Sequence, residues 1–394
     1  MTAAAKEAAA AVSLLESVTV EAFLQERRES PTALAKLGGG AGVVLIDNQS
    51  TCVASLPLKR AADARPCRSV GDALAKLAEA RVLSAPLVLR MTADASIYQV
   101  LAFISVRDFL RGLVDRAKER VPPELPLLRR MSSLSALGYA YALEPVYALH
   151  VADDGEMLYR GALRSTSLLS LVRAGFLRLP SQRPAIPPRH RVGVFDEHGH
   201  ITDIISQTDI TSWLRERPDA LGPLGQRTMQ ELGLVSGTST VVTVASTLPT
   251  DLALAVLAEQ SVPAVGVVDA VSGVLVGCFS ESDFRALTPS DFGSLALPVA
   301  QYLVYAKNLL VLETAERAAI GSPGAIVDPW AAALLEGANI TVTSQATLAQ
   351  AMDTLTAWRV HRIFVVDPAT GKPLAVVSHT DVLGVVVRGL KLQQ

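Results

Sequence analysis

The sequence is poor in the residues that mark secreted, metal-binding and redox proteins. Its 394 residues include three cysteines, Cys52, Cys67 and Cys278, and these show no metal-binding or redox spacing. An odd count without a Cys-x-x-Cys pair is typical of a reducing compartment. We therefore expect a cytoplasmic location, with the nucleus as an additional compartment.

The chain starts with about a dozen residues that are rich in alanine. This segment is expected to be disordered or to form a fraying helix.

Neither charge nor hydrophobicity indicates a polyanion or a membrane as partner. The 36 basic and 38 acidic residues give a formal net charge of −2, so no basic excess favours nucleic acid. No stretch approaches about 18 uninterrupted apolar residues, which argues against a membrane span. Half of the residues are hydrophobic, and the length suits two domains of ordinary size.

Motifs for common catalytic sites are also absent. The chain contains no Gly-x-Ser-x-Gly, no phosphate-binding glycine loop of either common kind and no His-Glu-x-x-His. The cluster DEHGH at Asp196–His200 coincides with a predicted hairpin turn, so turn residues account for it better than metal ligands. We therefore expect a protein without catalytic activity, without a metal and without a resident cofactor.

What the sequence does contain is one pattern repeated four times. An apolar strand runs into Ser-x-x-Asp, and a segment with helical periodicity follows. The copies are AFISVRDFLRGL, DIISQTDITSWL, VGCFSESDFRAL and AVVSHTDVLGVV, with the pairs Ser105/Asp108, Ser206/Asp209, Ser280/Asp283 and Ser378/Asp381. Internal repetition of this kind determines architecture before any other feature does.

Each copy extends upstream into a larger unit of helix, strand, strand and helix. Three copies show two aliphatic runs joined by an Asp and Gly turn, which indicates a hairpin; the turn residues are Asp196 and Gly199, Asp269 and Gly273, and Asp367 and Gly371. The first copy has a longer connection without glycine. Segments with helical periodicity precede the hairpins at residues 70–80, 166–176, 248–260 and 347–359.

The spacing of the copies indicates two pairs of repeats. Successive aspartates lie 101, 74 and 98 residues apart, so the short interval separates the second copy from the third. Residues 216–227 contain two prolines and two glycines and are the expected joint. The predicted repeats are residues 14–118 and 119–217 in the first pair, and 226–290 and 291–394 in the second.

These residues resemble those of the tandem CBS-domain family. The resemblance rests on the four Ser-x-x-Asp junctions, on SAPLVL at Ser84–Leu89, on HRVGVFD at His190–Asp196 and on VHRIFVVD at Val360–Asp367. Within the family the pattern is similar to that of the gamma subunits of AMP-activated protein kinase and their plant-type homologues. The resemblance implies an α+β fold of four CBS repeats, paired into two Bateman modules that form a disc.

The resemblance also implies an adenine-nucleotide ligand, AMP, ADP or ATP. The family uses the Asp of each junction to bind the ribose, which assigns that role to Asp108, Asp209, Asp283 and Asp381. It assigns Ser105, Ser206, Ser280 and Ser378 to the phosphate, together with the exposed N–H groups of the helix start. The protein would then be an energy-sensing regulatory subunit, with kinase catalytic and scaffold subunits or further copies of itself as partners.

Two His-Arg pairs are further candidates for phosphate binding. His190-Arg191 and His361-Arg362 open the first hairpin strand in the second and fourth repeats. Consecutive strand residues point to opposite faces, so only one of each pair can readily face a given cleft. The first and third repeats lack the pair, with VLSAPLV and QSVPAVGV in its place. His379, inside SHTD, lies either close to the predicted phosphate or in solvent.

Other interpretations of the same residues stay open. Ser-x-x-Asp is close to an ordinary capping box, in which a Ser cap and an acidic residue three positions on satisfy the free N–H groups of a helix start. On that interpretation the protein is a constitutive scaffold for other proteins. A third interpretation keeps ligand binding but replaces the nucleotide with another adenosyl compound.

Overall fold

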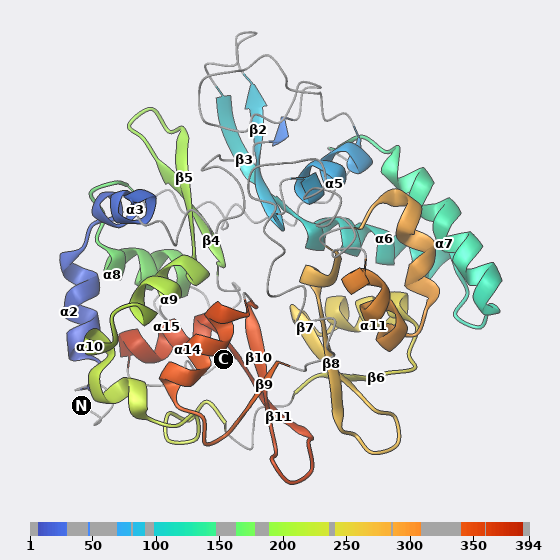
Figure 1. Ribbon diagram of the computed structural model, residues 1–394. Coiled ribbons are helices and arrows are strands. Elements are labelled where there is room, and N and C mark those ends of the chain that lie inside the picture. Colours follow the sequence, from blue (N-terminus) through green and yellow to red (C-terminus); the bar gives the residue numbers. More distant parts are fainter. Residues whose placement is uncertain are drawn as a thin grey trace. The chain divides into compact units, whose positions relative to one another are not determined.

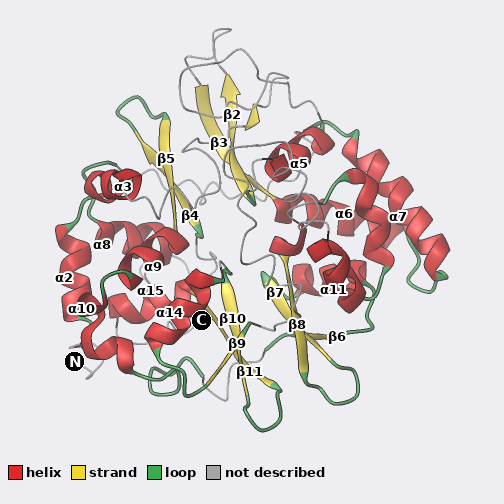
Figure 2. Ribbon diagram, in the orientation of Figure 1, coloured by secondary structure: helices red, strands yellow, loops and turns green. Residues whose placement is uncertain are grey.

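The repeated segments fold into units of helix, strand, strand and helix (Figure 1). The computed structural model describes residues 7–29, 46–47, 69–79, 82–90, 98–146, 163–177, 189–235, 241–284, 287–308, 340–358 and 360–388. Helices are mixed with small sheets of two or three strands, which confirms the predicted α+β class. Contacts divide the chain into two compact units, each with its helices gathered beside its strands (Figure 2).

Unit 1 is made of residues 1–38, 156–241 and 340–394, and so contains the hairpins and junctions of the second and fourth repeats, together with the start of the predicted first repeat. Its elements are α2 (Ala9–Ser17), α3 (Val20–Glu29), α8 (Leu168–Ser170), the π-helix η3 (Leu171–Leu177), β4 (Arg191–Phe195), β5 (Ile201–Ser206), α9 (Gln207–Arg215), α10 (Pro218–Leu221), the 3-10 helix η4 (Gly222–Gln226), β9 (Thr341–Thr343), α14 (Leu348–Ala357), β10 (Arg362–Val366), β11 (Pro373–Ser378) and α15 (His379–Arg388). Strand β10 pairs with β11 antiparallel and with β9 parallel.

Unit 2 is made of residues 39–155 and 242–339, and contains the hairpins and junctions of the first and third repeats, together with α7 from the predicted second repeat. Its elements are β1 (Ile46–Asp47), α5 (Val70–Glu79), β2 (Ser84–Arg90), β3 (Tyr98–Ser105), α6 (Val106–Arg120), α7 (Leu127–Ala142), β6 (Thr243–Ala245), α11 (Thr250–Glu259), β7 (Ala264–Val268), β8 (Leu275–Ser280) and the 3-10 helices η5 (Glu281–Phe284) and η6 (Pro289–Ala296). Each compact unit therefore joins alternate repeats along the chain.

The three short hairpins turn as the sequence predicts. In each turn the Asp side chain accepts hydrogen bonds from backbone N–H groups two to four residues on, as Asp367 does from Ala369 at 2.8 Å and Thr370 at 2.9 Å. The turn glycines adopt positive φ angles, 81° at Gly199, 71° at Gly273 and 66° at Gly371. Such angles are costly for other residues, which explains why glycine follows each aspartate.

The N-terminal segment is helical from Ala9, contrary to the expectation of a disordered or fraying start, of which residues 1–6 lie outside the described part. Helix α2 buries Ala11 and Leu15, and α3 buries Phe23, in the same apolar core as Val385 and Val386 of α15. The α2 and α3 helices are therefore built into unit 1. Their stability comes from this burial, since short helices are marginal in water on their own.

Three other segments differ from the sequence prediction. The expected joint at 216–227 forms α10 and η4, whose Leu221 and Leu224 are buried in the core of unit 1. The helix expected at 166–176 continues as a π-helix from Leu171. In the third repeat the described residues after Ser280 form only the short 3-10 turn η5, and Pro289, which disfavours helix at the residue before it, follows soon after.

None of the helices that the structure describes is both long enough and apolar enough to cross a bilayer.

The contact between α7 and η6 in unit 2 requires a glycine. A Cβ atom on Gly138 would lie 1.8 Å from Cδ2 of Phe292, a side chain that is itself buried. We expect Gly138→Ala to lower the free energy of unfolding by about 1–3 kcal/mol, because the buried ring must shift. Thermal unfolding measures this loss. Gly225→Ala, whose Cβ would meet its nearest atom at 3.4 Å, is the control, and equal stability of the two variants would contradict the prediction.

Candidate functional site

All four Ser-x-x-Asp junctions form the same local structure, in which the carboxylate of the Asp accepts two hydrogen bonds from its own Ser through Oδ2. The distances from the Ser N–H and hydroxyl are 2.7 and 2.8 Å for Asp108, 2.8 and 2.7 Å for Asp209, 2.7 and 3.2 Å for Asp283, and 2.9 and 2.7 Å for Asp381. The hydrogen bond from the serine N–H to the carboxylate is one half of a capping box, and the full box is formed at the starts of α6 and α9. Such caps contribute about 1 kcal/mol to a helix, so the junction residues also have the structural role that the sequence offers as an alternative.

Within each unit the corresponding junctions of the two repeats meet. In unit 1, Thr380 at the start of α15 donates its hydroxyl to Gln207 Oε1 at the start of α9, at 2.8 Å and in a buried position. In unit 2, Arg107 at the start of α6 forms an ion pair with Glu281 of η5. Residues 107 and 281 each follow a junction serine by one or two positions, so equivalent turns of two repeats lie side by side in both units.

The pairing of the hairpin strands decides which member of each His-Arg pair faces the junction. Arg191 is the direct partner of Ser206, and Arg362 is the direct partner of Ser378. Side chains of directly opposed residues in an antiparallel pair lie on the same face. The arginines therefore share a face with the serines, while His190 and His361 precede the strands.

The same positions are uncharged in unit 2. Ser105 is paired with Ser84, and Ser280 is paired with Ala264. The cations that a phosphate would require at this position are therefore present in unit 1 and absent from the matching positions of unit 2. Arg107, which follows Ser105 by two positions, is already paired with Glu281.

Burial lowers the pKa of two basic residues near the unit 1 junctions. Burial lowers the pKa of Arg191, and the charge of Asp209 opposes this shift in part. Burial lowers the pKa of His379 to about 4, with Val360 and Asp209 opposing the shift. The His379 side chain is 2% exposed, so it does not face solvent.

His379 is polar, buried and poorly bonded. Among the described residues, neither Nδ1 nor Nε2 has a partner with normal hydrogen-bond geometry, so the interaction with Val360 is a weak one. Its ring lies 6.4 Å from that of His361, measured between centroids. The sequence predicts that His379 lies either close to the phosphate or in solvent. The residues SHTD do not indicate that its side chain is buried.

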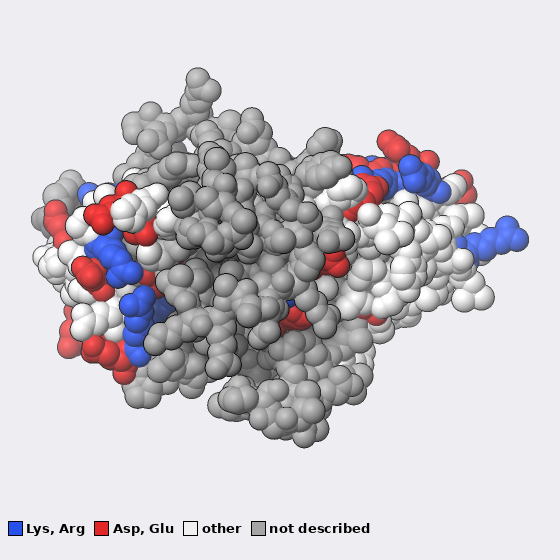
Figure 3. Space-filling model, turned by 90° about the horizontal axis from the view of Figure 1, so that it is seen from above, with Lys and Arg blue, Asp and Glu red and all other residues white. Residues whose placement is uncertain are grey.

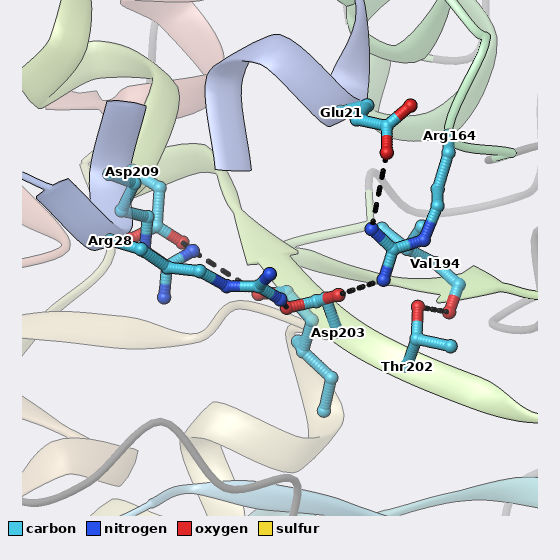
Figure 4. Close-up of polar contacts among 9 residues, drawn as sticks. Glu21, Arg28, Arg164, Val194, Thr202, Asp203 and Asp209 are labelled. Atoms are coloured by element: carbon cyan, nitrogen blue, oxygen red, sulfur yellow. Dashed lines mark hydrogen bonds and ion pairs between the residues drawn. The ribbon is translucent and has the colours of Figure 1, made fainter. Parts of the chain in front are cut away.

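A residue that the sequence did not indicate contacts the second junction. Arg27 of α3 lies with Nη1 3.3 Å from Oδ2 of Asp209, and the same nitrogen donates to the Ile204 carbonyl at 3.4 Å. Figure 4 shows Asp209 beside the network of Arg28, Asp203 and Arg164. Arginines near the end of a helix reveal nothing about which distant carboxylate they will meet, so no signal in the sequence could have identified Arg27.

On the face of the molecule drawn in Figure 3, the acidic and basic side chains of the described residues lie in mixed groups. Among the residues that the structure describes, no group of three or more His, Cys, Asp or Glu side chains could hold a metal ion.

Solved structures with a similar fold include a protein of Methanocaldococcus jannaschii, described as a candidate archaeal homologue of the gamma subunit of AMP-activated protein kinase. It is 13% identical, with a TM-score of 0.51 over 89% of this chain and 98% of that chain. An uncharacterised protein of Pyrococcus horikoshii is 14% identical, with a TM-score of 0.40 over 77% of this chain and 91% of that one. The protein CBSX2 in complex with AMP is 19% identical, with a TM-score of 0.24 over 41% of this chain and 94% of that chain.

Comparison of sequences matches a shorter part of the chain than comparison of structures does. No curated protein matches the chain. Residues 338–388, which span the fourth repeat from β9 to α15, match the family model described as CBS domain. Residues 338–388 are therefore a CBS domain, and the fold of the chain is similar to that of the archaeal structure.

Proposed function

We propose that the chain is a non-catalytic regulatory protein that binds adenine nucleotides at its Ser-x-x-Asp junctions. One observation supports this most: in unit 1, two junctions meet, and each combines a carboxylate, a serine hydroxyl, a helix start and an arginine opposite the serine. These are the groups needed for a ribose and a phosphate. An Asp carboxylate accepts hydrogen bonds from sugar hydroxyls, while arginine and helix N–H groups bind phosphate oxygens.

The arginines favour a phosphorylated ligand over an S-adenosyl compound. Arg191 and Arg362 place a positive charge opposite each junction serine. Arginine matches the geometry of phosphate with two parallel N–H donors, and a sulfonium compound would be repelled by the same charge. AMP, ADP and ATP are therefore the ligands to test first.

The junctions of unit 1 are better suited to bind a nucleotide than those of unit 2. In unit 2 the residues opposite the serines are Ser84 and Ala264, and Arg107 is paired with Glu281. The junction of the third repeat also leads into a four-residue 3-10 turn, so fewer N–H groups are aligned toward a ligand than at a full helix start. We propose Asp108 and Asp283 as weaker ribose sites than those of unit 1.

The proposed partner is a protein kinase complex. The archaeal protein with a similar fold is described as a candidate homologue of the kinase gamma subunit. A nucleotide would shift the partner's equilibrium only by its difference in affinity for the partner's two states. The proposal includes the pairing of residues 14–118 with 119–217, and of residues 226–290 with 291–394, as Bateman modules.

Replacing Asp381 tests the proposal directly. We expect Asp381→Ala to weaken AMP binding by about 10- to 100-fold in isothermal titration, because hydrogen bonds to a charged group contribute about 1.5–3 kcal/mol. Asp367→Ala is the matched control, since Asp367 lies in the turn at the other end of the same hairpin and bonds only to turn residues among those described. Loss of AMP binding in both variants, or in neither, would contradict the assignment of Asp381.

A constitutive scaffold is the second candidate. It is favoured by the capping geometry, which gives every junction aspartate a structural purpose without a ligand. A scaffold would bind none of the three nucleotides, and Asp381→Ala would cost it about 1 kcal/mol of stability and nothing else. The titration of wild-type protein therefore separates the two candidates.

A further inference from the structure

The two junctions of unit 1 differ in one respect. Both aspartates accept from the N–H and hydroxyl of their own serine, but Asp209 also has Arg27 at 3.3 Å, whereas the contacts of Asp381 among the described residues are all with its own Ser378. Resting on the proposed function, we infer that Arg27 closes the second junction to ribose. Arg27 is then the residue that decides which junction of unit 1 binds a nucleotide, and the fourth repeat holds the open site.

Helix α3 holds Arg27 rigidly in this position. Its apolar residues Val20, Phe23 and Leu24 are buried, and the Phe23 ring meets Trp213 edge to face at 6.0 Å between centroids. At its start, the backbone N–H of Val20 donates to the Thr166 carbonyl at 2.8 Å. The backbone that carries Arg27 is thus fixed by its helix, so pairing with the carboxylate costs only the rotamer freedom of the Arg27 side chain.

Polar contacts hold the other end of α3. Trp213 Nε1 donates to Glu26 Oε2 at 3.0 Å, and Arg28 pairs with Asp203 at 2.8 Å. Arg164 also binds Asp203, at 3.3 Å, and reaches Glu21 at 3.8 Å (Figure 4). Several contacts that do not involve Arg27 therefore keep the helix in place.

Arg27 competes with a ribose for the same group. Its guanidinium contacts Oδ2 of Asp209, the oxygen that also accepts from the Ser206 N–H and hydroxyl. A ribose hydroxyl is a neutral donor to the carboxylate, whereas the guanidinium adds the attraction between opposite charges to its contact with Asp209. A nucleotide at Asp209 would have to displace this cation, while at Asp381 no such ion pair is formed among the described residues.

The ion pair is still in contact with solvent. Side-chain exposure is 21% for Arg27 and 18% for Asp209. Removing the guanidinium should therefore uncover the carboxylate to water and ligand, and not leave a dry cavity. Replacing Arg27 is therefore expected to let the Asp209 junction bind a nucleotide.

Isothermal titration with AMP tests the inference. We expect Arg27→Ala to bind one more AMP per chain than the wild type does, and Arg27→Ala combined with Asp209→Ala to return to the wild-type number. The added site should not bind 2′,3′-dideoxy-AMP, which lacks the diol that a carboxylate would hold. Arg28→Ala is the control, because it lies next in sequence and pairs with Asp203 instead.

The outcomes separate this inference from the proposed function. If the wild type binds AMP and Arg27→Ala adds no site or binds more weakly, Arg27 does not close the junction. The inference is also overturned if Asp209→Ala alone weakens wild-type binding as much as Asp381→Ala does. If no protein in the series binds, the proposed function fails as well. Arg27→Met, which keeps the apolar stem, replaces the alanine variant if circular dichroism shows that the latter is unfolded.

Discussion

Replacing Arg130 with methionine is expected to lower the free energy of unfolding of unit 2 by about 3–5 kcal/mol. Arg130 of α7 binds Asp251 of α11 through two hydrogen bonds, of 3.2 Å from Nε and 2.5 Å from Nη2, and its Nη1 donates to the Pro122 carbonyl at 3.0 Å. The two side chains are 3% and 7% exposed. Removing the guanidinium would leave the carboxylate of Asp251 buried without its counter-charge.

Arg129→Met is the matched control for this prediction. Arg129 is adjacent but exposed, so its replacement should change stability by less than about 0.5 kcal/mol. Hydrogen exchange of peptides from α7 and α11 measures the loss within unit 2. The double variant Arg130→Met with Asp251→Leu should recover much of the stability, because no charge then remains buried. Equal effects of Arg129→Met and Arg130→Met would contradict the prediction.

Acidification is expected to destabilise unit 1 through His379. Burial lowers the pKa of this residue to about 4 in the folded protein, while an unfolded histidine titrates near 6.5. Between these values the unfolded chain binds a proton that the folded chain does not, so stability falls as the pH falls from 6.5 toward 4. We expect about 2 kcal/mol of the loss between pH 7 and pH 5 to come from His379.

The variant His379→Gln isolates that contribution from the titration of other groups. It should lose about 2 kcal/mol less than the wild type between pH 7 and pH 5. His198→Gln is the control, because the His198 side chain is 71% exposed. Urea unfolding followed by tryptophan fluorescence measures both variants, since Trp213 and Trp358 lie in unit 1. Parallel curves of stability against pH for wild type and His379→Gln would refute the assignment.

Local features of the fold could be predicted from the sequence because each depends on neighbouring residues. The hairpins follow from the alternation of aliphatic runs with Asp and Gly, and the junctions follow from Ser and Asp three residues apart. The strand register adds that Arg191 and Arg362 are the members of their pairs that lie opposite the serines. The length of each hairpin is consistent with this register, but only the observed strand pairing establishes which residue lies opposite the serine.

Contacts between distant segments could not be predicted in the same way. Arg27 meets Asp209 across 182 positions of the sequence, and Arg130 meets Asp251 across 121. Nothing in the local pattern of either arginine distinguishes it from an exposed neighbour such as Arg28 or Arg129. The spacing of the repeats likewise contains no sign that the second repeat forms a compact unit with the fourth, because this depends on which apolar helix faces fit together.

The alternation of the two units along the chain has a consequence for biosynthesis. Helix α2 packs against α15, so its apolar residues Ala11 and Leu15 acquire their full set of neighbours only after residue 379 has been made. At about 5–20 residues per second, the ribosome needs roughly 20–70 s to cover that interval. During this time the first helices have left the ribosome with their apolar faces unpaired. The nascent chain therefore depends on chaperones for longer than a protein whose domains are contiguous in sequence.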